Sequence, residues 1–328
     1  MNFRHAKTFL LGALALCFLI SLFQNQINSY WLIISYNIGI NVVMAVSLNL
    51  INGYTGQFSL GHAGFMAVGA YTSAVITNQF DQLNFFAANG IFLVALLAGG
   101  LLAAIAGLLV GLPTLRLKGD YLAIVTLGFG EIIRVILQNT DFVGGARGLS
   151  VKHPWTNFFW TFGLAAVTIY VIATLVNSTY GRGFIAVRDD EIAAEAMGIN
   201  TTKYKVTAFV VGAFFAGIAG GLYAHAIQFL TPNGFGFMQS IAFVVMVILG
   251  GMGNAVGVIL AAVLLTLLPE GLRMLAGIEH LPGIAKAHPL GWLGGTRMII
   301  YSLLLILLML TRPQGLFTFR NSKLKTKN

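Results

Sequence analysis

The segment 178–205 reads STYGRGFIAVRDDEIAAEAMGINTTKYK and lies between two long apolar runs, 158–177 and 206–226. Four of the ten acidic residues of the protein fall here within seven positions, and four basic residues flank them: Asp189, Asp190, Glu191 and Glu195, with Arg182, Arg188, Lys203 and Lys205. A charged side chain at the centre of a bilayer costs about 2.5–3.5 kcal/mol on insertion scales. A cluster of this density is therefore expected in water. The segment therefore predicts a soluble loop on a membrane protein.

The same segment contains the signals of a short helix. Asp189 and Asp190 suit a helix N-terminus, where carboxylates accept free backbone N–H bonds and meet the positive end of the helix dipole. Gly198 is well placed to end that helix in a left-handed conformation. The helix is about eight residues long, and isolated helices shorter than ~12–15 residues are marginal in water. We therefore expect the membrane helices or a partner to hold it, although an ordinary solvated connector explains the charges equally well.

Composition places the whole chain in the class of polytopic membrane proteins. Hydrophobic residues make up 57% of the 328 and charged residues only 9%, and the mean hydropathy is +0.84. Soluble domains carry about 25% charged residues. The net charge of +9 arises from Lys and Arg residues that lie between apolar runs rather than on one face. That distribution indicates membrane orientation and argues against a nucleic-acid partner. The single Cys17 excludes an intramolecular disulfide.

Apolar runs of suitable length predict an all-α protein with about ten transmembrane helices, because a helix needs ~20 apolar residues to cross the hydrocarbon layer. The predicted spans are 9–23, 30–51, 62–78, 90–112, 119–138, 158–177, 205–226, 238–251, 254–269 and 295–311. The eighth and ninth are short and meet in a glycine-rich turn, so one broken span is an alternative. The first resembles a secretory signal in its charge pattern, but no A-x-A-like cleavage site follows it, which favours a membrane helix.

The distribution of basic residues orients these spans. With both termini inside, the inside segments hold 13 of the 19 Lys and Arg residues: Arg4, Lys7, Arg116, Lys118, Arg182, Arg188, Lys203, Lys205, Arg312, Arg320, Lys323, Lys325 and Lys327. This is the positive-inside bias. It predicts one membrane domain, 1–328, with both termini cytoplasmic, the loop 178–205 between spans six and seven, and a basic cytoplasmic tail at 312–328.

The glycine-rich stretch 52–71, NGYTGQFSLGHAGFMAVGAY, follows span two and runs into the first half of span three, where it interrupts the apolar pattern. Irregular backbone at membrane depth persists only where protein or a water-filled cavity covers it, and broken helices line substrate paths in transporters. Gly56, Gln57, Ser59 and His62 are therefore candidates for such a path. Close helix packing explains the glycines better, whereas for Gln57 and His62 the two interpretations are equally good.

Two further groups of charged residues lie in span five and in the outer loops. Glu131 and Arg134 share a helix face in span five at i,i+3, which favours a structural pair over a substrate contact; Glu270 and Arg273 repeat the spacing. The outer loops 139–157 and 271–294 either receive a soluble partner or are plain connectors. Their candidates for contact with a partner are Arg147, Lys152 and Lys286.

The small-residue pairs Gly107/Gly111, Gly217/Gly221 and Gly253/Gly257 predict helix packing faces.

The motifs that the chain lacks limit its chemistry. The sequence contains no G-x-x-x-x-G-K-[ST] phosphate loop, no H-E-x-x-H, no G-x-S-x-G and no Cys/His cluster with metal spacing. The chain therefore has no ATP site of the phosphate-loop kind, and we assign it no catalytic, metal or cofactor-binding residue.

Several stretches in the same order resemble one family. The segments 52–71, 115–134 (LRLKGDYLAIVTLGFGEIIR), 144–149 (GGARGL) and 183–198 (GFIAVRDDEIAAEAMG) are similar to the LivM-type permeases of branched-chain amino acid ABC importers. The resemblance implies the type II importer architecture and a subunit of the bacterial inner membrane, surrounded by lipid. It also implies three kinds of partner: a LivH-type permease, two cytoplasmic ATP-binding cassette subunits, and a periplasmic protein that delivers leucine, isoleucine or valine.

The resemblance assigns a role to the loop as well. Permeases of ABC importers dock a cytoplasmic coupling helix into the ATPase, often with an E-A-A-x-x-x-G pattern. Here Ala193, Ala194 and Gly198 match that pattern, but Ile192 stands where the glutamate is expected and Glu191 precedes it. The implied coupling residues are Phe184, Arg188, Asp189, Asp190, Glu191, Ala194, Glu195 and Gly198. Urea or short-amide permeases share much of this pattern, and a stand-alone channel or secondary carrier is the alternative from another class.

Overall fold

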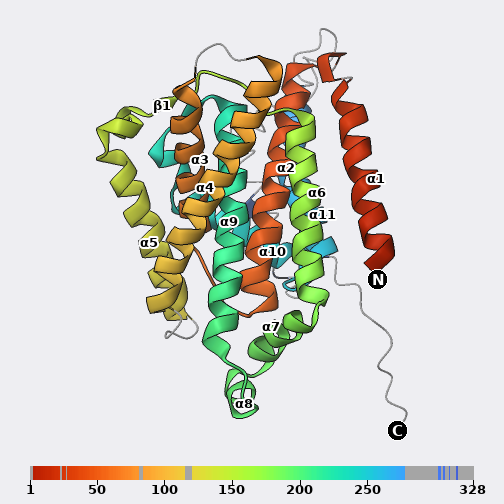
Figure 1. Ribbon diagram of the computed structural model, residues 1–328, viewed down its shortest axis with the longest axis vertical. Coiled ribbons are helices and arrows are strands. Elements are labelled where there is room, and N and C mark those ends of the chain that lie inside the picture. The colour runs from red at the N-terminus through yellow and green to blue at the C-terminus, as the bar shows by residue number, and fades with distance from the viewer. Residues whose placement is uncertain are drawn as a thin grey trace, which may run out of the picture.

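The computed structural model describes residues 3–22, 24–26, 28–80, 84–114 and 120–277, together with a few isolated positions after residue 301. The long helices of these residues stand side by side in one bundle (Figure 1). They are α1 Phe3–Leu22, α2 Ser29–Asn49, α3 His62–Asn78, α4 Phe85–Thr114, α5 Asp120–Gln138, α6 Phe158–Asn177, α9 Thr201–Ile227, α10 Phe237–Gly250 and α11 Ala255–Gly277.

Short elements connect them. Two small helices, α7 Thr179–Asp189 and α8 Glu191–Ala196, join α6 to α9, and a π-helical turn η2, Leu50–Tyr54, continues α2. Four 3-10 turns lie elsewhere: η1 Gln24–Gln26, η3 Asp141–Val143, η4 Gly145–Arg147 and η5 Pro232–Phe235. Two two-residue strands, β1 Leu149–Ser150 and β2 Phe229–Leu230, pair antiparallel, with Leu149 opposite Leu230.

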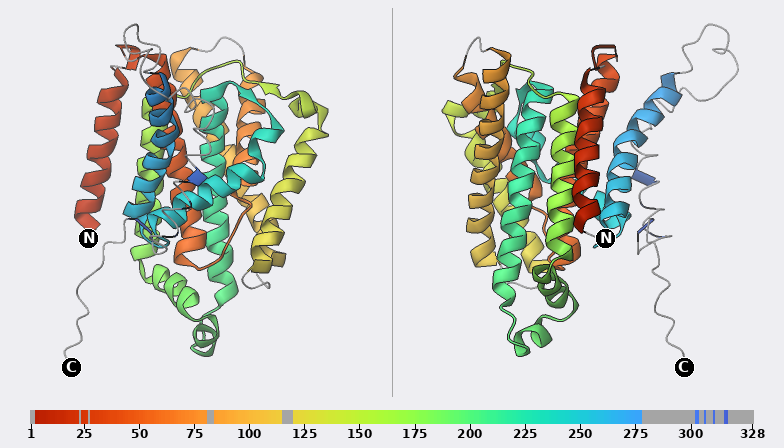
Figure 2. Two further views of the ribbon diagram at one scale, coloured as in Figure 1. Left: turned by 180° about the vertical axis from the view of Figure 1, so that it is seen from behind. Right: turned by 45° about the vertical axis from the view of Figure 1, so that its right-hand side comes forward.

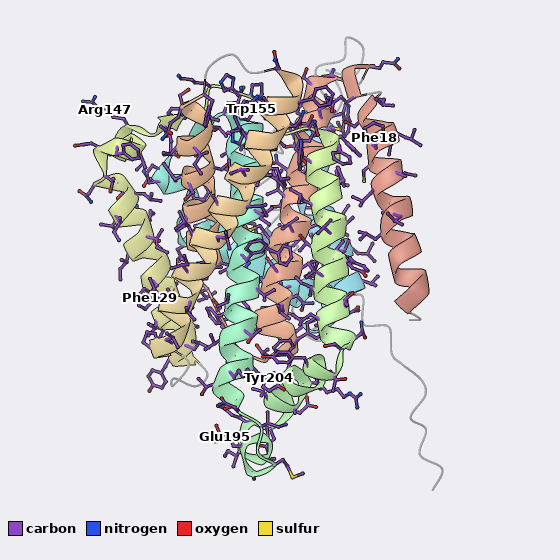
Figure 3. The ribbon with its side chains drawn as sticks, in the orientation of Figure 1. Phe18, Phe129, Arg147, Trp155, Glu195 and Tyr204 are labelled. Atoms are coloured by element: carbon purple, nitrogen blue, oxygen red, sulfur yellow. The ribbon has the colours of Figure 1, made fainter. Side chains whose placement is uncertain are left out.

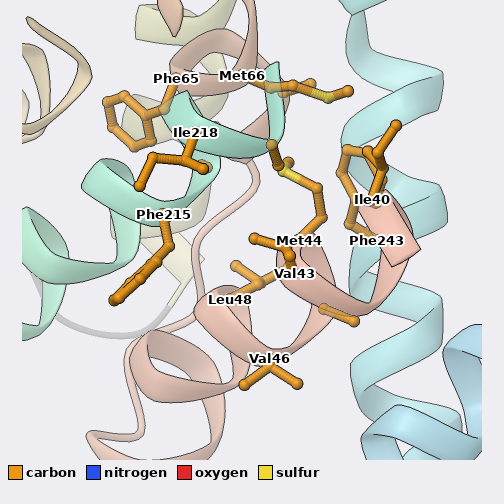
Figure 4. Close-up of a cluster of buried hydrophobic side chains, with 14 of the residues drawn as sticks. Ile40, Val43, Met44, Val46, Leu48, Phe65, Met66, Phe215, Ile218 and Phe243 are labelled. Atoms are coloured by element: carbon orange, nitrogen blue, oxygen red, sulfur yellow. The ribbon is translucent and has the colours of Figure 1, made fainter. Parts of the chain in front are cut away.

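The core forms around α9, which packs closely against α3 and α4. A Cβ on Gly217 would lie 2.6 Å from the Cβ of Ala103 and 2.7 Å from the carbonyl oxygen of Gly99, and a Cβ on Gly69 would overlap the backbone of Gly217. Gly107 is held in the same way against Ala213. The prediction of small-residue packing faces is confirmed at these positions: without a side chain, the helix backbones approach closely and gain dispersion contacts. Figure 4 shows the larger side chains of α2, α3, α9 and α10 that fill the adjoining core.

Nine of the ten predicted spans coincide with described helices. Their ends agree to within five residues, except that α1 begins six residues before its predicted span and α11 ends eight residues after its own. Seven of the described helices, some together with the short turn beside them, are long and apolar enough to cross a membrane. Helix α3 is slightly shorter, and α1 contains the shorter apolar stretch Leu10–Leu22. The tenth predicted span, 295–311, lies outside the continuously described residues. The protein is thus a helical membrane protein, and the count of ten stays a prediction.

The glycine-rich turn after residue 250 separates two helices. The Gly250 carbonyl contacts the Gly257 backbone, so α10 and α11 pack against each other directly after the turn. Both Pro232–Gly250 and Ala255–Met274 are long enough to span a membrane. The structure thus has two packed helices here, and their assignment as two separate spans stays a prediction.

The connecting elements divide between the two ends of the bundle. The segment α7–α8 extends beyond the lower end of the long helices in Figure 1, and the N-terminal end of α1 points to the same end (Figures 1 and 2). The strands β1 and β2 lie at the opposite end (Figure 1). Helix α5 lies at the margin of the bundle, tilted away from its neighbours. We call the two ends the α8 end and the β end.

Candidate functional site

The segment α7–α8 is built from capped helices. Ser178 caps α7 by accepting a 3.2 Å bond from the backbone N–H of Gly181. Asp190 caps α8 by accepting from the N–H groups of Ile192 (2.9 Å) and Ala193 (3.0 Å), so its predicted capping role is confirmed. The same expectation for Asp189 was wrong: it is the last residue of α7 and pairs with Arg188 at 2.8 Å. A helix end receives one N-cap side chain, and the extended backbone of Asp190 places that residue there.

The C-terminus of α8 has the predicted glycine. Gly198 has φ +80°, in the left-handed region that glycine adopts without a Cβ penalty. The N–H of Ile199 bonds to the carbonyl of Ala194 at 3.0 Å, and the N–H of Gly198 bonds to that of Glu195 at 2.9 Å. This is the Schellman arrangement. It allows a helix of only six residues to turn directly into α9.

Contacts with α9 hold the segment in place. Lys205, only 7% exposed, bonds to Glu191 at 2.6 Å, and the hydroxyl of Thr201 donates to Glu195 at 2.7 Å. Phe184 is fully buried and packs edge-on against the rings of Tyr180 (5.4 Å) and Tyr204 (5.7 Å). These contacts supply what a six-residue helix lacks on its own. Figure 3 shows Tyr204 close to the bundle and Glu195 near the tip.

Two apolar side chains stand exposed at this tip. Ile192 is 72% exposed and Met197 is 83% exposed, while Ala194 between them is buried against the protein. The family pattern identifies neither of them: Ile192 stands where the pattern has a glutamate, and Met197 falls at one of its unspecified positions. The signal that identifies them is the inward position of Ala194, which turns its neighbours outward. Of the predicted coupling residues, Phe184 and Ala194 are internal, whereas Asp189, Asp190 and Glu195 lie on the surface.

The last turn of α7 contacts the irregular stretch of the core. A Cβ on Gly56 would lie 3.0 Å from the Cγ of Arg188, and one on Gly253 would lie 3.2 Å from its Nη1. The backbone N–H of Gly253 donates in turn to the side chain of Asn49 at 2.9 Å. Arg188 therefore touches both the break between α2 and α3 and the turn between α10 and α11.

That break holds polar atoms for which the described residues offer no partner. Buried side-chain atoms without a hydrogen bond are Asn49 Nδ2, Asn52 Nδ2, Gln57 Nε2, Ser59 Oγ and His62 Nδ1. The other side-chain atoms of Asn52 and His62 are engaged: Asn52 accepts from the Ser59 N–H at 3.2 Å, and the Nε2 of His62 lies 2.9 Å from the Ser47 hydroxyl. A buried polar atom without a partner costs about 1–3 kcal/mol. The break therefore carries a concentration of unsatisfied polar atoms within the core.

The glycines of the same stretch behave differently from its polar residues. A Cβ on Gly64 would lie 2.9 Å from the Cα of Gly130, and one on Gly61 would overlap the carbonyl of Thr126. These contacts with α5 agree with the interpretation of the glycines as packing residues. Gly56 has φ +68° and contacts Arg188 instead.

Glu131 and Arg134 form a second polar site, on α5. The Nε of Arg134 donates to Glu131 at 2.6 Å, and its Nη1 donates to Asn233 of η5 at 3.0 Å. The pair lines a cleft of about 420 Å³ with Asn233, Gly234, Gly236, Phe237, Met238 and Gln239. Within the described residues no hydrogen bond joins the lining of this cleft to Gln57 or His62, so the predicted path residues fall into two groups.

The candidates for binding a soluble partner lie at the β end. Arg147 is exposed and ends η4 (Figure 3), and exposed Lys152 follows β1, its backbone N–H bonded to Asn78 at 3.0 Å. Trp155 stacks between His153 and His225, at 4.9 and 5.8 Å, which fixes this loop to α9. Lys286 lies outside the described residues.

Removing the ring of Phe184 should loosen the segment α7–α8. Phe184→Ala leaves a cavity among Tyr180 and Tyr204, and such truncations cost about 3–5 kcal/mol. We expect faster proteolysis within 178–205 of the purified protein, while the rest of the chain remains resistant. Met197→Ala removes an exposed side chain of the same segment and should not change the cleavage rate. Equal rates for Phe184→Ala and the unmodified protein would contradict this account.

Comparison with known proteins identifies the family of this chain. Residues 30–310 match the family described as branched-chain amino acid transport system / permease component. The high-affinity branched-chain amino acid transport system permease protein LivM of Escherichia coli is 36% identical over 324 residues, covering 88% of this chain and 70% of that protein. A probable LivM of Methanocaldococcus jannaschii is 26% identical over 323 residues, covering 85% and 90%.

Relatives that match a shorter part of the chain are named for a different substrate. The autoinducer 2 import system permease protein LsrC of Yersinia pseudotuberculosis is 32% identical over 193 residues, covering 56% of this chain and 54% of that protein. No solved structure matches the chain. From the family match and the LivM identities, the chain is a multi-pass membrane permease and belongs to the family of branched-chain amino acid transport system permease components.

Proposed function

We propose that this chain is the membrane-spanning permease subunit of an ATP-driven importer of leucine, isoleucine and valine. The named substrate of the LivM relatives supports the substrate class. The chain has no phosphate-loop motif of its own, so ATP hydrolysis belongs to two partner ATP-binding cassette subunits. A second permease of LivH type completes the membrane part, and a periplasmic binding protein delivers the substrate.

The observation that best supports this proposal is the position and surface of the segment α7–α8. It extends beyond the membrane helices, it is fixed to α9 by the Lys205–Glu191 pair, and it exposes the apolar tip of Ile192 and Met197. Exposed apolar side chains with a polar rim are typical of sites that receive another protein. We assign the α8 end to the cytoplasm, where the ATPases bind, and the β end with Arg147 and Lys152 to the periplasm. Both termini are then cytoplasmic, in the inner membrane.

The mechanism that fits these contacts is alternating access. Closure of the paired ATPases on ATP moves the tip; α7 transmits the movement through Arg188 to the break at Gly56 and to the turn at Gly253. The helices shift at their small-residue contacts, and the polar atoms of Asn52, Gln57 and His62 become accessible to water and solute. Rigid elements that pivot about packed interfaces are one of the common ways in which proteins switch between states.

Uptake by the reconstituted complex tests this function. The chain is co-expressed with a LivH-type permease, two ATPase subunits and the binding protein, and the complex is placed in proteoliposomes. We expect accumulation of labelled leucine, isoleucine and valine that requires ATP and the binding protein, and no accumulation when this chain is present alone. Accumulation of urea or short amides instead would assign a different substrate. Uptake by the chain alone would establish a channel or secondary carrier and contradict the proposal.

A further inference from the structure

Helix α5 is the least buried of the candidate membrane spans, and it carries an ion pair on the side that meets η5 and the start of α10. Only 17% of the apolar stretch of α5 is buried within the protein, the smallest share among the seven candidate spans. On this helix Arg134 and Glu131 keep 25% and 33% of their side chains exposed. Seven residues separate Glu131 from the end of α5 at Gln138, which places the pair within roughly 10 Å of the β end. A charged pair at such a position is expected to face water or protein rather than lipid.

The cleft beside this pair combines two kinds of lining. On one side are the charged groups of Glu131 and Arg134, and on the other are the partly exposed, apolar side chains of Phe237 and Met238 at the start of α10. Its volume of about 420 Å³ falls in the range of small-molecule sites, roughly 300–1,000 Å³. Gly236 lies beside the pair: a Cβ there would come into ordinary van der Waals contact with both residues, 3.8 Å from Glu131 Oε1 and 3.9 Å from Arg134 Cδ.

The hydrogen bonds of the pair leave a matched donor and acceptor. The described bonds of Arg134 use its Nε and Nη1, and Glu131 receives the Nε bond on Oε2. Asn233 also accepts from Gln138 at 2.7 Å, so the guanidinium is held from two elements, α5 and η5. Nη2 of Arg134 and Oε1 of Glu131 remain for a ligand. A guanidinium recognises a carboxylate, and a carboxylate recognises an ammonium group.

We propose that this cleft is the substrate-binding subsite of the permease for the α-amino acid backbone. Arg134 binds the α-carboxylate, Glu131 binds the α-ammonium group, and Phe237 with Met238 contacts the branched side chain. A site of zero net charge suits a ligand of zero net charge, because neither partner enters with an unpaired charge. The subsite rests on the proposed function and adds to it the residues that contact the substrate as it enters from the β end.

Uptake by variants of the assembled importer gives the first test. Arg134→Gln and Glu131→Gln should each lower leucine uptake at least tenfold, with the complex still assembled on size-exclusion chromatography. Arg273→Gln is the matched control, since Arg273 forms the same i,i+3 pair with Glu270 on α11, outside the cleft, and should retain full uptake. The reversed pair, Glu131→Arg with Arg134→Glu, restores an ion pair but presents the wrong charge to each end of the ligand. Its uptake should remain low; recovery to the level of the unmodified complex would show a structural pair and overturn the subsite.

Chemical protection gives a second test that leaves the pair intact. Met238→Cys is introduced in a Cys17→Ser background, and the rate of modification of the new thiol is measured on the assembled complex. Leucine should slow the modification at least threefold, whereas its 2-oxo acid, which lacks the ammonium group, should have no effect. If leucine gives no protection, the subsite is excluded even where uptake is normal. If the unmodified complex imports no branched-chain amino acid, it is the proposed function that fails.

Discussion

An importer whose chain carries Ile192→Asp together with Met197→Asp should lose ATP-driven uptake while the chain remains folded in the membrane. Both side chains are exposed at the tip of α8, so the substitutions disturb no internal packing. Against a partner surface that receives apolar side chains, each buried carboxylate is left without a partner. Substitutions at the central positions of an interface cost about 2 kcal/mol or more each. The pair therefore lowers the association constant with the ATPase roughly a thousandfold.

Two measurements check this result: co-purification of the ATPase subunits with the chain, and leucine uptake by the complex. The matched control is Phe142→Asp, which changes an exposed aromatic side chain of η3, near the β end. It should leave ATPase co-purification unchanged. Normal ATPase binding and uptake by the double variant would remove the coupling role from α8. A second variant, Arg188→Glu with Glu195→Arg, should likewise abolish uptake without loss of the permease from the membrane.

Gly69→Ala is expected to have the largest effect on the fold. The added methyl group would overlap the backbone of Gly217, which cannot rotate away as a side chain can. Overpacking of this kind typically costs 1–3 kcal/mol, and we expect about 3 kcal/mol because the contact is backbone to backbone. The reason is geometric: α3, α4 and α9 approach one another through glycines, so one methyl group separates all three helices.

Thermal unfolding of the detergent-purified chain measures the effect, and Gly128→Ala provides the comparison. Gly128 also lies within a transmembrane helix, α5, but a Cβ there would meet nothing within 4 Å. That substitution should be neutral or stabilising by up to about 1 kcal/mol, since alanine favours a helix more than glycine does. A similar melting temperature for Gly69→Ala and the unmodified chain would show that the α3–α9 contact is not a close one.

Much of the helical framework was predictable because it depends on patterns local to the chain. The runs 62–78 and 158–177 coincide with α3 and α6 to the residue. A continuous apolar run of this length in a membrane protein leaves the backbone little choice but a helix. The helix ends of the loop 178–205 were also largely foreseen, since Asp190 and Gly198 act through bonds to residues only a few positions away. The prediction that Asp189 also caps the helix was wrong, because two adjacent aspartates compete for a single cap position.

Other features escaped prediction because they depend on distant residues. The contact of Arg188 with Gly56 and Gly253 joins three segments far apart in the sequence. The cleft at Glu131 and Arg134 requires η5 and the start of α10, about a hundred residues further along. From spacing alone the pair was interpreted as structural, because nothing local indicates the open volume beside it. The exposure of Ile192 and Met197 likewise follows from the way α8 rests on α9.

The sequence alone determined that this protein is a helical membrane permease with one charged, helix-forming loop, because charge, apolarity and capping act over a few residues or a single span. The tertiary structure alone decided which side chains meet. It buried Phe184, exposed the apolar tip, placed Arg188 against the break in the core and opened a cleft beside an ion pair. Those outcomes depend on how glycine-lined helices fit together, and a close fit between distant surfaces leaves no trace in local sequence pattern.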